Sequence, residues 1–352
     1  MGMNIKDFRD ISWNVTEEEY RNDPYLSYST LATYERGGFN ALPSLFDKKE
    51  SPSLTFGSAV DSILTGGMDE FNERFIVADF PELPESIVKI VKRLFSTFKD
   101  KYNSLSKIPT DDIIYVTQEE GYQLNWKADT RVKVIKEKGA EYYGLLYIVE
   151  GGKTIITQSM YEDVLKTVDS LRNSESTRKY FADDNPFEPD IKHYYQLKFK
   201  GVLNGIGYRS MADLIVVDYK NKVVYPCDLK TSSHYEWDFF KSFVEWNYSI
   251  QAKLYWRLIR QAMDNDDYFK DFSLSNYQFI VVNKNSLTPL VWEFEETQST
   301  EDIVVGSKKQ IIMRDPETIG KELYYYLNHD NKVPVGIECN KPNSLLVWLN
   351  KM

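Results

Sequence analysis

The chain has 352 residues and a formal net charge of -10, since 53 acidic residues outnumber 43 basic ones. Hydrophobic residues make up 42% and charged residues 27%, with 17 glycines and 13 prolines, which excludes collagen-like, low-complexity and wholly disordered classes. The charge argues against a uniformly basic protein that coats nucleic acid, although a local basic patch would be enough for an enzyme that binds a phosphate backbone in one cleft.

The sequence has no membrane-spanning or secretory pattern. No stretch approaches the roughly 18 apolar residues of a membrane span, and the first residues, MGMNIKDFRDISW, lack the apolar core of a signal peptide. Two cysteines, Cys227 and Cys339, cannot form a disulfide framework, a four-thiolate zinc site or an iron-sulfur cluster from one chain. We therefore expect a cytoplasmic protein with no membrane association.

Helical patterns dominate residues 1–190. Apolar residues recur there at the spacing of one helix face, behind residues that commonly start helices. We expect helices that begin at Ser27 or Ser29, at Thr55 and at Pro84-Glu85, and two more over Tyr122 to Ile135 and Tyr161 to Leu171.

From about residue 191 the pattern changes to that of strands, rich in β-branched and aromatic residues. The predicted strands are Tyr194 to Lys200, Ile206 to Asp218, Lys222 to Leu229, Tyr277 to Asn283 and Leu290 to Phe294. Helices are predicted over Glu236 to Met263 and from about Thr300 to Leu327. The order predicts an α/β fold in which residues 191–352 form a central mixed β-sheet flanked by helices. The helical part, residues 1–190, would pack on that sheet, with no firm boundary between them.

Two apolar runs around the polar turn at Lys220 and Asn221 predict a β-hairpin. With these two residues at its tip, Asp213 lies directly opposite Asp228 on the neighbouring strand. Lys230 follows Asp228 by two positions and therefore projects from the same face. A shift of the tip by one residue would move the partner of Asp213 by two positions, so the opposition depends on this turn.

Two carboxylates about 5 Å apart repel each other unless something neutralises them. Mg²⁺ is a suitable neutraliser because it prefers oxygen ligands and is commonly held by one or two carboxylates and a substrate phosphate; we expect Mn²⁺ to substitute for it. Lys230 could then orient or activate a water beside the scissile phosphorus. An Asp-x-Lys tripeptide by itself more often marks a solvated strand edge. Here, however, the apolar run Ile215-Val216-Val217 predicts a central, buried hairpin, in which charged side chains are expected only if they are paired or bind a ligand. The pattern favours a phosphodiester hydrolase.

The next predicted helix places Gln251 and Tyr255 on one face, one turn apart. Taken alone, this is an amphipathic helix with aromatic residues in the core. An amide and a phenol at this spacing could also position Lys230 or contact a backbone phosphate.

The order Asp213, then Asp228-Leu229-Lys230, then Gln251-x-x-x-Tyr255 resembles the PD-(D/E)XK nuclease superfamily, with its restriction-endonuclease-like core. Upstream, the segments DPYLSYSTL, FGSAVD and TIIT resemble the phage and prophage recombination exonucleases, mainly the exodeoxyribonuclease VIII nuclease domain and more distantly lambda exonuclease. The resemblance covers roughly residues 20–260. It implies that the catalytic residues are Asp213, Asp228, Lys230, Gln251 and Tyr255, and that the metal ligands are Asp213, Asp228 and the backbone carbonyl of Leu229.

The chain departs from the family pattern at two positions. Asp61 stands where the family commonly has a histidine that approaches the metal, and it is a candidate ligand as well as an ordinary polar helix residue. Gln196 stands where the family often has a glutamate, which puts a two-metal mechanism in doubt.

The resemblance also suggests residues that contact substrate. Ser27 and Ser29, with Arg36, could bind a terminal phosphate as family members bind a 5′ end, although helix capping explains the serines equally well. Thr231 and Ser232, which follow the catalytic lysine, are further candidates. The histidines His193, His234 and His329 have no metal-ligand spacing and are expected to be structural.

These observations lead us to expect a Mg²⁺-dependent exonuclease that degrades one strand of linear duplex DNA and leaves a single-stranded overhang for recombination. By family resemblance it would act 5′ to 3′ on free ends, pass its product to a single-strand annealing protein and form a homo-oligomer. The alternatives are an endonuclease or repair nuclease of the same superfamily, or an inactive DNA-binding or scaffold protein that keeps the fold.

Overall fold

The computed structural model describes residues 5–47, 51–79, 81–181, 190–295, 301–305 and 310–328, so His329 and Cys339 lie outside the described residues. The chain divides into two compact units. Met1–Ser51 and Lys166–Met352 form the sheet unit, and Pro52–Leu165 form the helical unit. Residues 1–190 contribute to both units.

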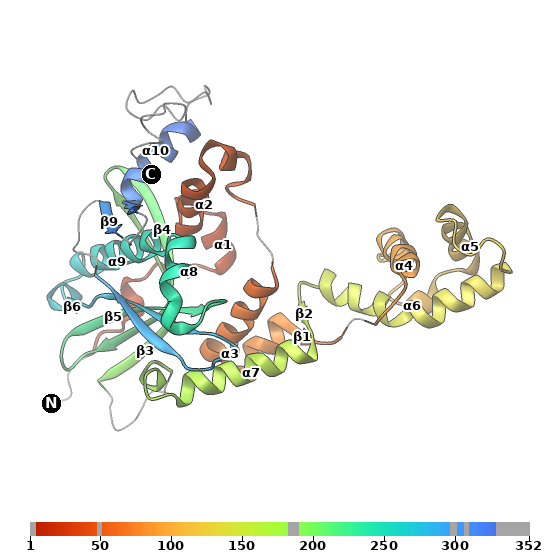
Figure 1. Cartoon of the computed structure of the whole chain (residues 1–352), viewed down its shortest axis with the longest axis horizontal. Helices are drawn as coiled ribbons and strands as arrows, with labels where there is room; N and C mark the ends of the chain where they lie inside the picture. Colours follow the sequence, from red (N-terminus) through yellow and green to blue (C-terminus); the bar gives the residue numbers. More distant parts are fainter. Residues whose placement is uncertain are drawn as a thin grey trace. The chain divides into compact units, whose positions relative to one another are not determined.

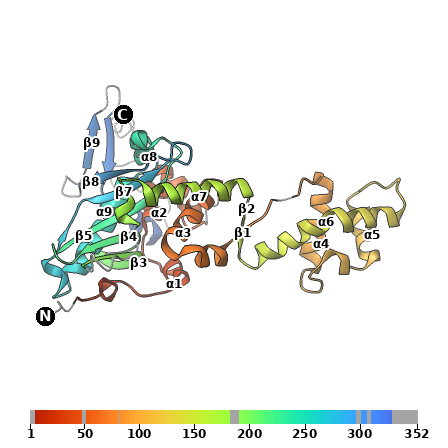
Figure 2. The same ribbon diagram turned by 90° about the horizontal axis from the view of Figure 1, so that it is seen from below.

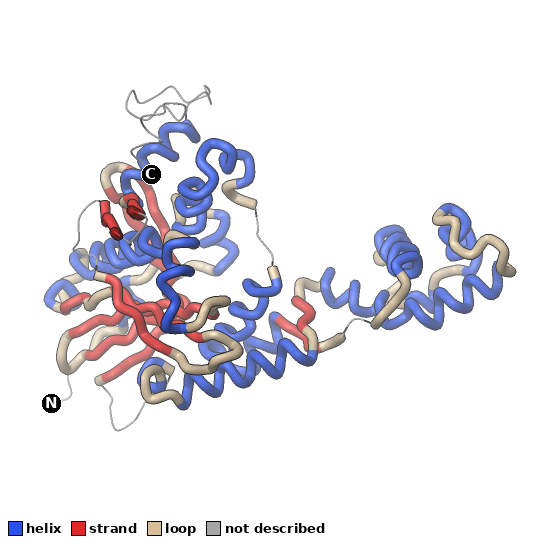
Figure 3. The backbone as a smooth tube through the Cα atoms, viewed as in Figure 1, coloured by secondary structure: helices blue, strands red, loops and turns tan. Residues whose placement is uncertain are grey.

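A mixed six-stranded β-sheet lies at the centre of the sheet unit (Figure 3). Its strands are β3 (Ile191–Leu203), β4 (Ile206–Asp218), β5 (Val223–Thr231), β7 (Tyr277–Val282) and β8 (Leu290–Phe294), in that spatial order, and β6 (Ser273–Leu274) beside β5. Neighbours are antiparallel except that β5 runs parallel to β6 and β7. The expected α/β fold with a central mixed sheet, flanking helices and a helical N-terminal half is confirmed.

Helices of the sheet unit pack around this sheet. They are α1 (Glu17–Asn22), α2 (Tyr28–Gly37), α8 (Phe239–Glu245), α9 (Tyr248–Asp264) and α10 (Pro316–Asn328), with short 3₁₀ turns at Phe8–Ile11, Gly38–Ser44, Arg178–Tyr180, Glu236–Asp238 and Phe269–Asp271. Helix α9 lies against strands β3 and β4 (Figure 1) and buries Ile250, Leu254 and Leu258 in their shared core. The expected helical stretch from Glu236 to Met263 is present, but Asn247 has a left-handed φ of 55° that divides it into α8 and α9.

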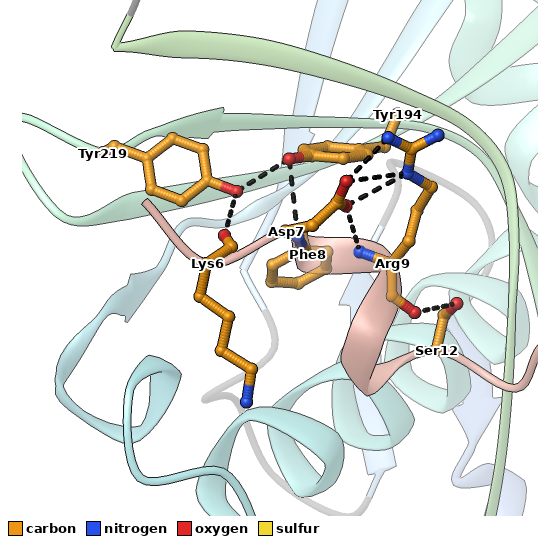
Figure 4. Close-up of polar contacts among 7 residues, drawn as sticks. All are labelled: Lys6, Asp7, Phe8, Arg9, Ser12, Tyr194 and Tyr219. Carbon is orange, nitrogen blue, oxygen red and sulfur yellow. Dashed lines mark hydrogen bonds and ion pairs between the residues drawn. The ribbon is translucent and has the colours of Figure 1, made fainter. Parts of the chain in front are cut away.

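The first residues are anchored to the sheet (Figure 4). Phe8 is fully buried, and its ring lies 4.9 Å from the ring of Phe269. The hydroxyl of Tyr219 donates to the Lys6 carbonyl at 2.9 Å, and the hydroxyl of Tyr194 lies 2.7 Å from that of Tyr219. The N-terminal segment therefore belongs to the same core as strands more than 180 residues later, as the separation of 186 between Phe8 and Tyr194 shows.

The expected helix from Thr300 to Leu327 is wrong in its first half. Strands β9 (Glu301–Val305) and β10 (Gln310–Arg314) form an antiparallel pair there, and α10 begins only at Pro316. Ile303, Val304 and Val305 in β9 and Ile311 and Ile312 in β10 favour this conformation. Proline suits the first position of a helix, and the Asp315 carboxylate accepts a hydrogen bond from the Glu317 amide at 2.9 Å.

Helices α4, α5 and α6 form the core of the helical unit and lie side by side in Figure 2. The elements that begin in this unit are α3 (Pro52–Arg74), β1 (Phe75–Val77), α4 (Glu85–Phe98), a 3₁₀ turn (Leu105–Lys107), α5 (Thr110–Glu119), α6 (Ala128–Glu150), β2 (Thr154–Ile156) and α7 (Gln158–Asn173). The helix expected from Tyr122 starts only at Ala128, because Gly121 and Gln123 adopt positive φ angles. None of the described helices is long and apolar enough to cross a bilayer.

Candidate active site

The register of strands β4 and β5 brings the two predicted carboxylates together. Leu214 pairs with Cys227, and the next position outward in each strand is Asp213 and Asp228. The predicted hairpin register is therefore confirmed. Asp213 is half-buried, whereas the Asp228 side chain is 1% exposed.

The ladder between these strands ends where the carboxylates begin, since no pair beyond Leu214 and Cys227 belongs to it. Beyond that pair the Asp213 side chain links the two strands in place of a backbone hydrogen bond, because its Oδ2 accepts a hydrogen bond of 3.1 Å from the backbone amide of Leu229. The contact fixes Asp213 across the gap between β4 and β5, beside the carbonyl that the family resemblance implies as a ligand.

Two side chains hold the Asp228 carboxylate. Gln251 donates from Nε2 to Oδ1 at 2.5 Å, and Lys230 Nζ lies 2.5 Å from Oδ2. The lysine side chain is 16% exposed, so this ion pair is largely withdrawn from water. The structure thus gathers four of the predicted catalytic residues, Asp213, Asp228, Lys230 and Gln251, around one end of β5.

An aromatic ring closes the lysine side of the site. Lys230 Nζ lies 4.5 Å from the centroid of the Tyr248 ring, a cation-π geometry. Burial lowers the pKa of Lys230, but Asp228, Tyr248 and Asp213 raise it by more, so the pKa of the lysine lies above its ordinary value. In the metal-free protein the lysine is therefore an ammonium ion.

Tyr248 was not among the predicted catalytic residues. It precedes Gln251 by three positions and Tyr255 by seven, so all three lie on one face of α9. Helical spacing could therefore have found it. Tyr255 is buried, and burial followed by nearby Tyr20 and Asp228 raises its pKa well above the ordinary value, so its phenol stays protonated.

Gln196 lies opposite Asp213 on strand β3. The flanking pairs are Tyr195 with Leu214 and Leu197 with Ala212, and the ladder skips the pair between them. Gln196 also has a left-handed φ of 54°, which interrupts the regular strand at this level. The register therefore aligns Gln196, Asp213 and Asp228 across three neighbouring strands.

Asp61 lies in α3 of the helical unit, where Thr65 Oγ1 donates to its backbone carbonyl at 3.0 Å. Its assignment as a metal ligand stays a prediction.

The predicted phosphate-binding residues lie in α2 and at its N-cap, and the hydroxyl groups of the two serines have structural partners. Ser27 is the N-cap of this helix and accepts from the Thr30 amide, while its hydroxyl lies 2.9 Å from that of Ser29. Arg36 is exposed, lies 5.3 Å from the Trp246 ring centroid and donates to the Trp246 carbonyl at 3.1 Å. Capping accounts for Ser27, and Arg36 remains accessible to an anion.

Thr231 and Ser232 end and follow strand β5. Thr231 is half-buried opposite Val282. The Ser232 hydroxyl lies 3.1 Å from that of Ser242 and accepts from the His234 amide at 3.1 Å. Ser232 therefore shapes the loop that leaves the site.

The donor chemistry of the site suits a divalent cation. No group of three or more histidines, cysteines and acidic residues placed to hold a metal occurs among the described residues. The two aspartates nevertheless supply hard oxygen donors of the number that Mg²⁺ commonly takes from a protein. Asp228 Oδ2 is buried and lies 2.5 Å from Lys230 Nζ, so a divalent cation held by this oxygen would compete with the ammonium for it.

No protein-family model and no curated protein matches the chain. Among solved structures, the chain is similar to a protein from Eubacterium rectale described as a "putative exonuclease", with 15% sequence identity and a TM-score of 0.40. The alignment covers 97% of this chain and 88% of the other. The chemistry of the site is inferred from its own residues.

Proposed function

We propose that the protein is a metal-dependent deoxyribonuclease of the PD-(D/E)XK type. One observation carries this proposal: Asp213 and Asp228 face each other across β4 and β5, and Lys230 contacts the second of them. A purely structural site has no need of two opposed acids, since one would satisfy the lysine without the repulsion between them.

The metal would be Mg²⁺, for which Mn²⁺ can substitute, and the residues that would hold it are Asp213, Asp228 and the carbonyl of Leu229. When bound, such an ion supplies Lewis-acid polarisation of a phosphate oxygen and lowers the pKa of a water.

The remaining residues bind and orient. As an ammonium ion, Lys230 can donate to a phosphate oxygen or to the attacking water, and the Tyr248 ring shields it from bulk solvent. Gln251 fixes the rotamer of Asp228 through Oδ1 and leaves Oδ2 to the substrate side. The protonated phenol of Tyr255 adds a buried dipole on the same face of α9.

The sequence resemblance supports an exonuclease that degrades linear duplex DNA from free ends, 5′ to 3′, and leaves single-stranded overhangs for recombination. A single-strand annealing protein would receive the product, and a homo-oligomer would enclose the DNA. The accessible Arg36, near the Tyr28 hydroxyl that donates to the same Trp246 carbonyl at 2.7 Å, is the candidate contact for a terminal phosphate.

The test is hydrolysis of end-labelled linear duplex DNA with and without Mg²⁺, by the wild type and by Lys230→Ala, with covalently closed circular DNA as the control substrate. We expect metal-dependent release of mononucleotides from linear DNA only, lost in the variant. Cleavage of closed circles would make the protein an endonuclease. Absence of cleavage from both substrates would overturn the assignment in favour of a DNA-binding or scaffold role.

A further inference from the structure

The loop that follows the catalytic strand is fixed to the neighbouring strand β7 by one amide side chain. Asn283, which is buried, donates from Nδ2 to the carbonyls of Ser232, Ser233 and His234 at 3.0, 3.2 and 3.3 Å. Three successive carbonyls are thus held by one side chain. This loop is a rigid continuation of the strand that carries Lys230.

A buried carboxylate fixes the next residues of this loop. Glu236 is fully buried, and it accepts hydrogen bonds from the amides of Asn283 and Thr288 at 2.9 and 3.1 Å and from the Ser286 hydroxyl at 2.6 Å. In addition, Trp292 Nε1 donates to the Glu236 carbonyl at 2.9 Å. The backbone on either side of Glu236 has little freedom to move.

Two aromatic side chains flank this fixed point and face solvent. Tyr235 is 50% exposed and Trp237 is 60% exposed, although both precede the well-buried Phe239. Their rings are stacked, with centroids 4.5 Å apart and planes inclined by 7°. A rigid segment that places two large rings in water, instead of in the adjacent core, is typical of a binding surface.

Some of the acidic side chains near this pair have charge partners. Asp238 forms an ion pair of 2.5 Å with Lys241, whereas Glu245 lies 3.9 Å from His234, a contact that compensates its charge only when the histidine is protonated. Glu236 is hidden from solvent among its hydrogen-bond donors. Asp238 and Glu236 therefore add little repulsion toward a phosphate backbone that approaches the rings.

We propose that Tyr235 and Trp237 form a stacking platform for unpaired bases of single-stranded DNA beside the active site. The choice of DNA rests on the proposed function. Flat, parallel rings match the faces of nucleobases, which are available in a single strand but stacked away in a duplex. The loop begins directly after β5, so a strand that contacts Lys230 can continue onto the platform.

The test measures binding without cleavage, in a chelator that removes divalent cations. The probes are a fluorescein-labelled oligothymidylate and an abasic strand of equal length and charge. The variants are Tyr235→Ala, Trp237→Ala and Trp237→Phe, with Tyr324→Ala as a matched control, because Tyr324 is also 50% exposed and lies in α10 of the same unit. Thermal unfolding confirms that each variant is folded.

We expect Trp237→Ala to weaken oligothymidylate binding about tenfold, and Tyr235→Ala by a similar factor, as expected for the loss of one stacked base. Trp237→Phe and Tyr324→Ala should bind as the wild type does. The abasic strand should bind the wild type weakly and be insensitive to all four changes.

Equal oligothymidylate affinity of the wild type and both alanine variants would overturn the platform, as would equal affinity of the wild type for the two probes. A change in the oligomeric state of the alanine variants, with unchanged affinity, would make a second copy the occupant and also overturn it. Mg²⁺-dependent cleavage of duplex DNA without base-dependent binding would remove only the platform. Base-dependent binding without cleavage would remove only the nuclease assignment.

Discussion

The side-chain amide of Gln251 donates a 2.5 Å hydrogen bond to Oδ1 of Asp228, which ties helix α9 to strand β5 at the most buried carboxylate of the site. The bond selects one rotamer of Asp228 and leaves its second oxygen toward Lys230. Gln251 is therefore a positioning residue, which acts on the reaction through Asp228.

Replacing Gln251 with alanine should lower the apparent affinity for Mg²⁺, and the cleavage rate at limiting Mg²⁺, by roughly 10- to 100-fold, as is usual when the partner of a metal-ligating side chain is removed. The KM for DNA should stay within about twofold of the wild type, because Gln251 is buried and does not face the substrate. Steady-state cleavage rates, measured once with Mg²⁺ varied and once with DNA varied, give the apparent Mg²⁺ affinity and the KM for DNA. A raised KM with an unchanged Mg²⁺ dependence would instead assign Gln251 to DNA binding.

Asp228 and Lys230 should be coupled in stability. Asp228→Asn leaves a largely buried ammonium without its partner, and Lys230→Met leaves a buried carboxylate, so each should lower the free energy of unfolding by about 3 kcal/mol. The double variant should lose less than the sum of the two. Urea unfolding in the presence of a chelator measures the free energy of unfolding of the wild type, the two single variants and the double variant. Strictly additive losses would show that the pair is not coupled.

Lys230→Met should abolish cleavage and yet strengthen cation binding. In the metal-free protein the ammonium lies 2.5 Å from the oxygen that a divalent cation would take, so the two positive charges compete for Asp228. Isothermal titration calorimetry with Ca²⁺, a cation that also takes oxygen ligands, should show a lower dissociation constant for the variant than for the wild type. Weaker binding would mean that Lys230 helps to assemble the site.

Asp61→Asn tests the remaining predicted ligand. If Asp61 binds the metal, the variant should need a higher Mg²⁺ concentration for half-maximal cleavage, with a shift of roughly tenfold. Asp69→Asn, in α3 beyond the break in helical geometry at Gly67, is the control. An unchanged Mg²⁺ titration would show that Asp61 is an ordinary polar helix residue.

Asp266 should stabilise the sheet unit in a pH-dependent way. It pairs with Lys6 and accepts from the amides of Tyr268 and Phe269 at 3.0 and 3.1 Å. Burial raises the pKa of Asp266, but its hydrogen bonds with Lys6, Phe269 and Tyr268 together lower the pKa by more. The pKa of Asp266 therefore lies below the ordinary value of 3.8. A carboxylate with a depressed folded-state pKa contributes stability above its unfolded pKa and loses it as the pH falls through the folded value.

Asp266→Asn should therefore lower the melting temperature at pH 7, and the difference from the wild type should shrink as the pH falls below about 4. Thermal unfolding at pH 7 and pH 3 measures this. The control is Asp267→Asn, whose fully exposed side chain pairs only with Lys270 among the contacts of the described residues. A deficit of the Asp266 variant that is constant with pH would exclude the proposed linkage.

The hairpin could be predicted because its information is local. The turn at Lys220 and Asn221 sets the register, and the alternation of a strand then decides that Asp213, Asp228 and Lys230 converge. The spacing of Gln251 similarly places it on a defined helix face. The contacts of each side chain could not be predicted from local sequence. The position of Tyr248 over Lys230, for example, depends on how α9 packs on the sheet.

Longer-range features were missed for the same reason. The break at Asn247 is a single left-handed residue within a pattern that otherwise favours a helix. The strands at Glu301–Val305 and Gln310–Arg314 are short, and a helical pattern next to them masked their β-branched residues. The grouping of the first 51 residues with the sheet depends on contacts such as Phe8 with Phe269, which no local pattern encodes.

That grouping sets an order for folding during synthesis. The helical unit closes its core within one continuous stretch, Pro52–Leu165, so its packing partners all leave the ribosome before the sheet is translated. Phe8 also packs against Tyr194 and Phe199, but its contact with Phe269 cannot form until about three-quarters of the chain has been made. A truncation before Phe269 would therefore remove the last aromatic partner of Phe8 and leave its core incomplete.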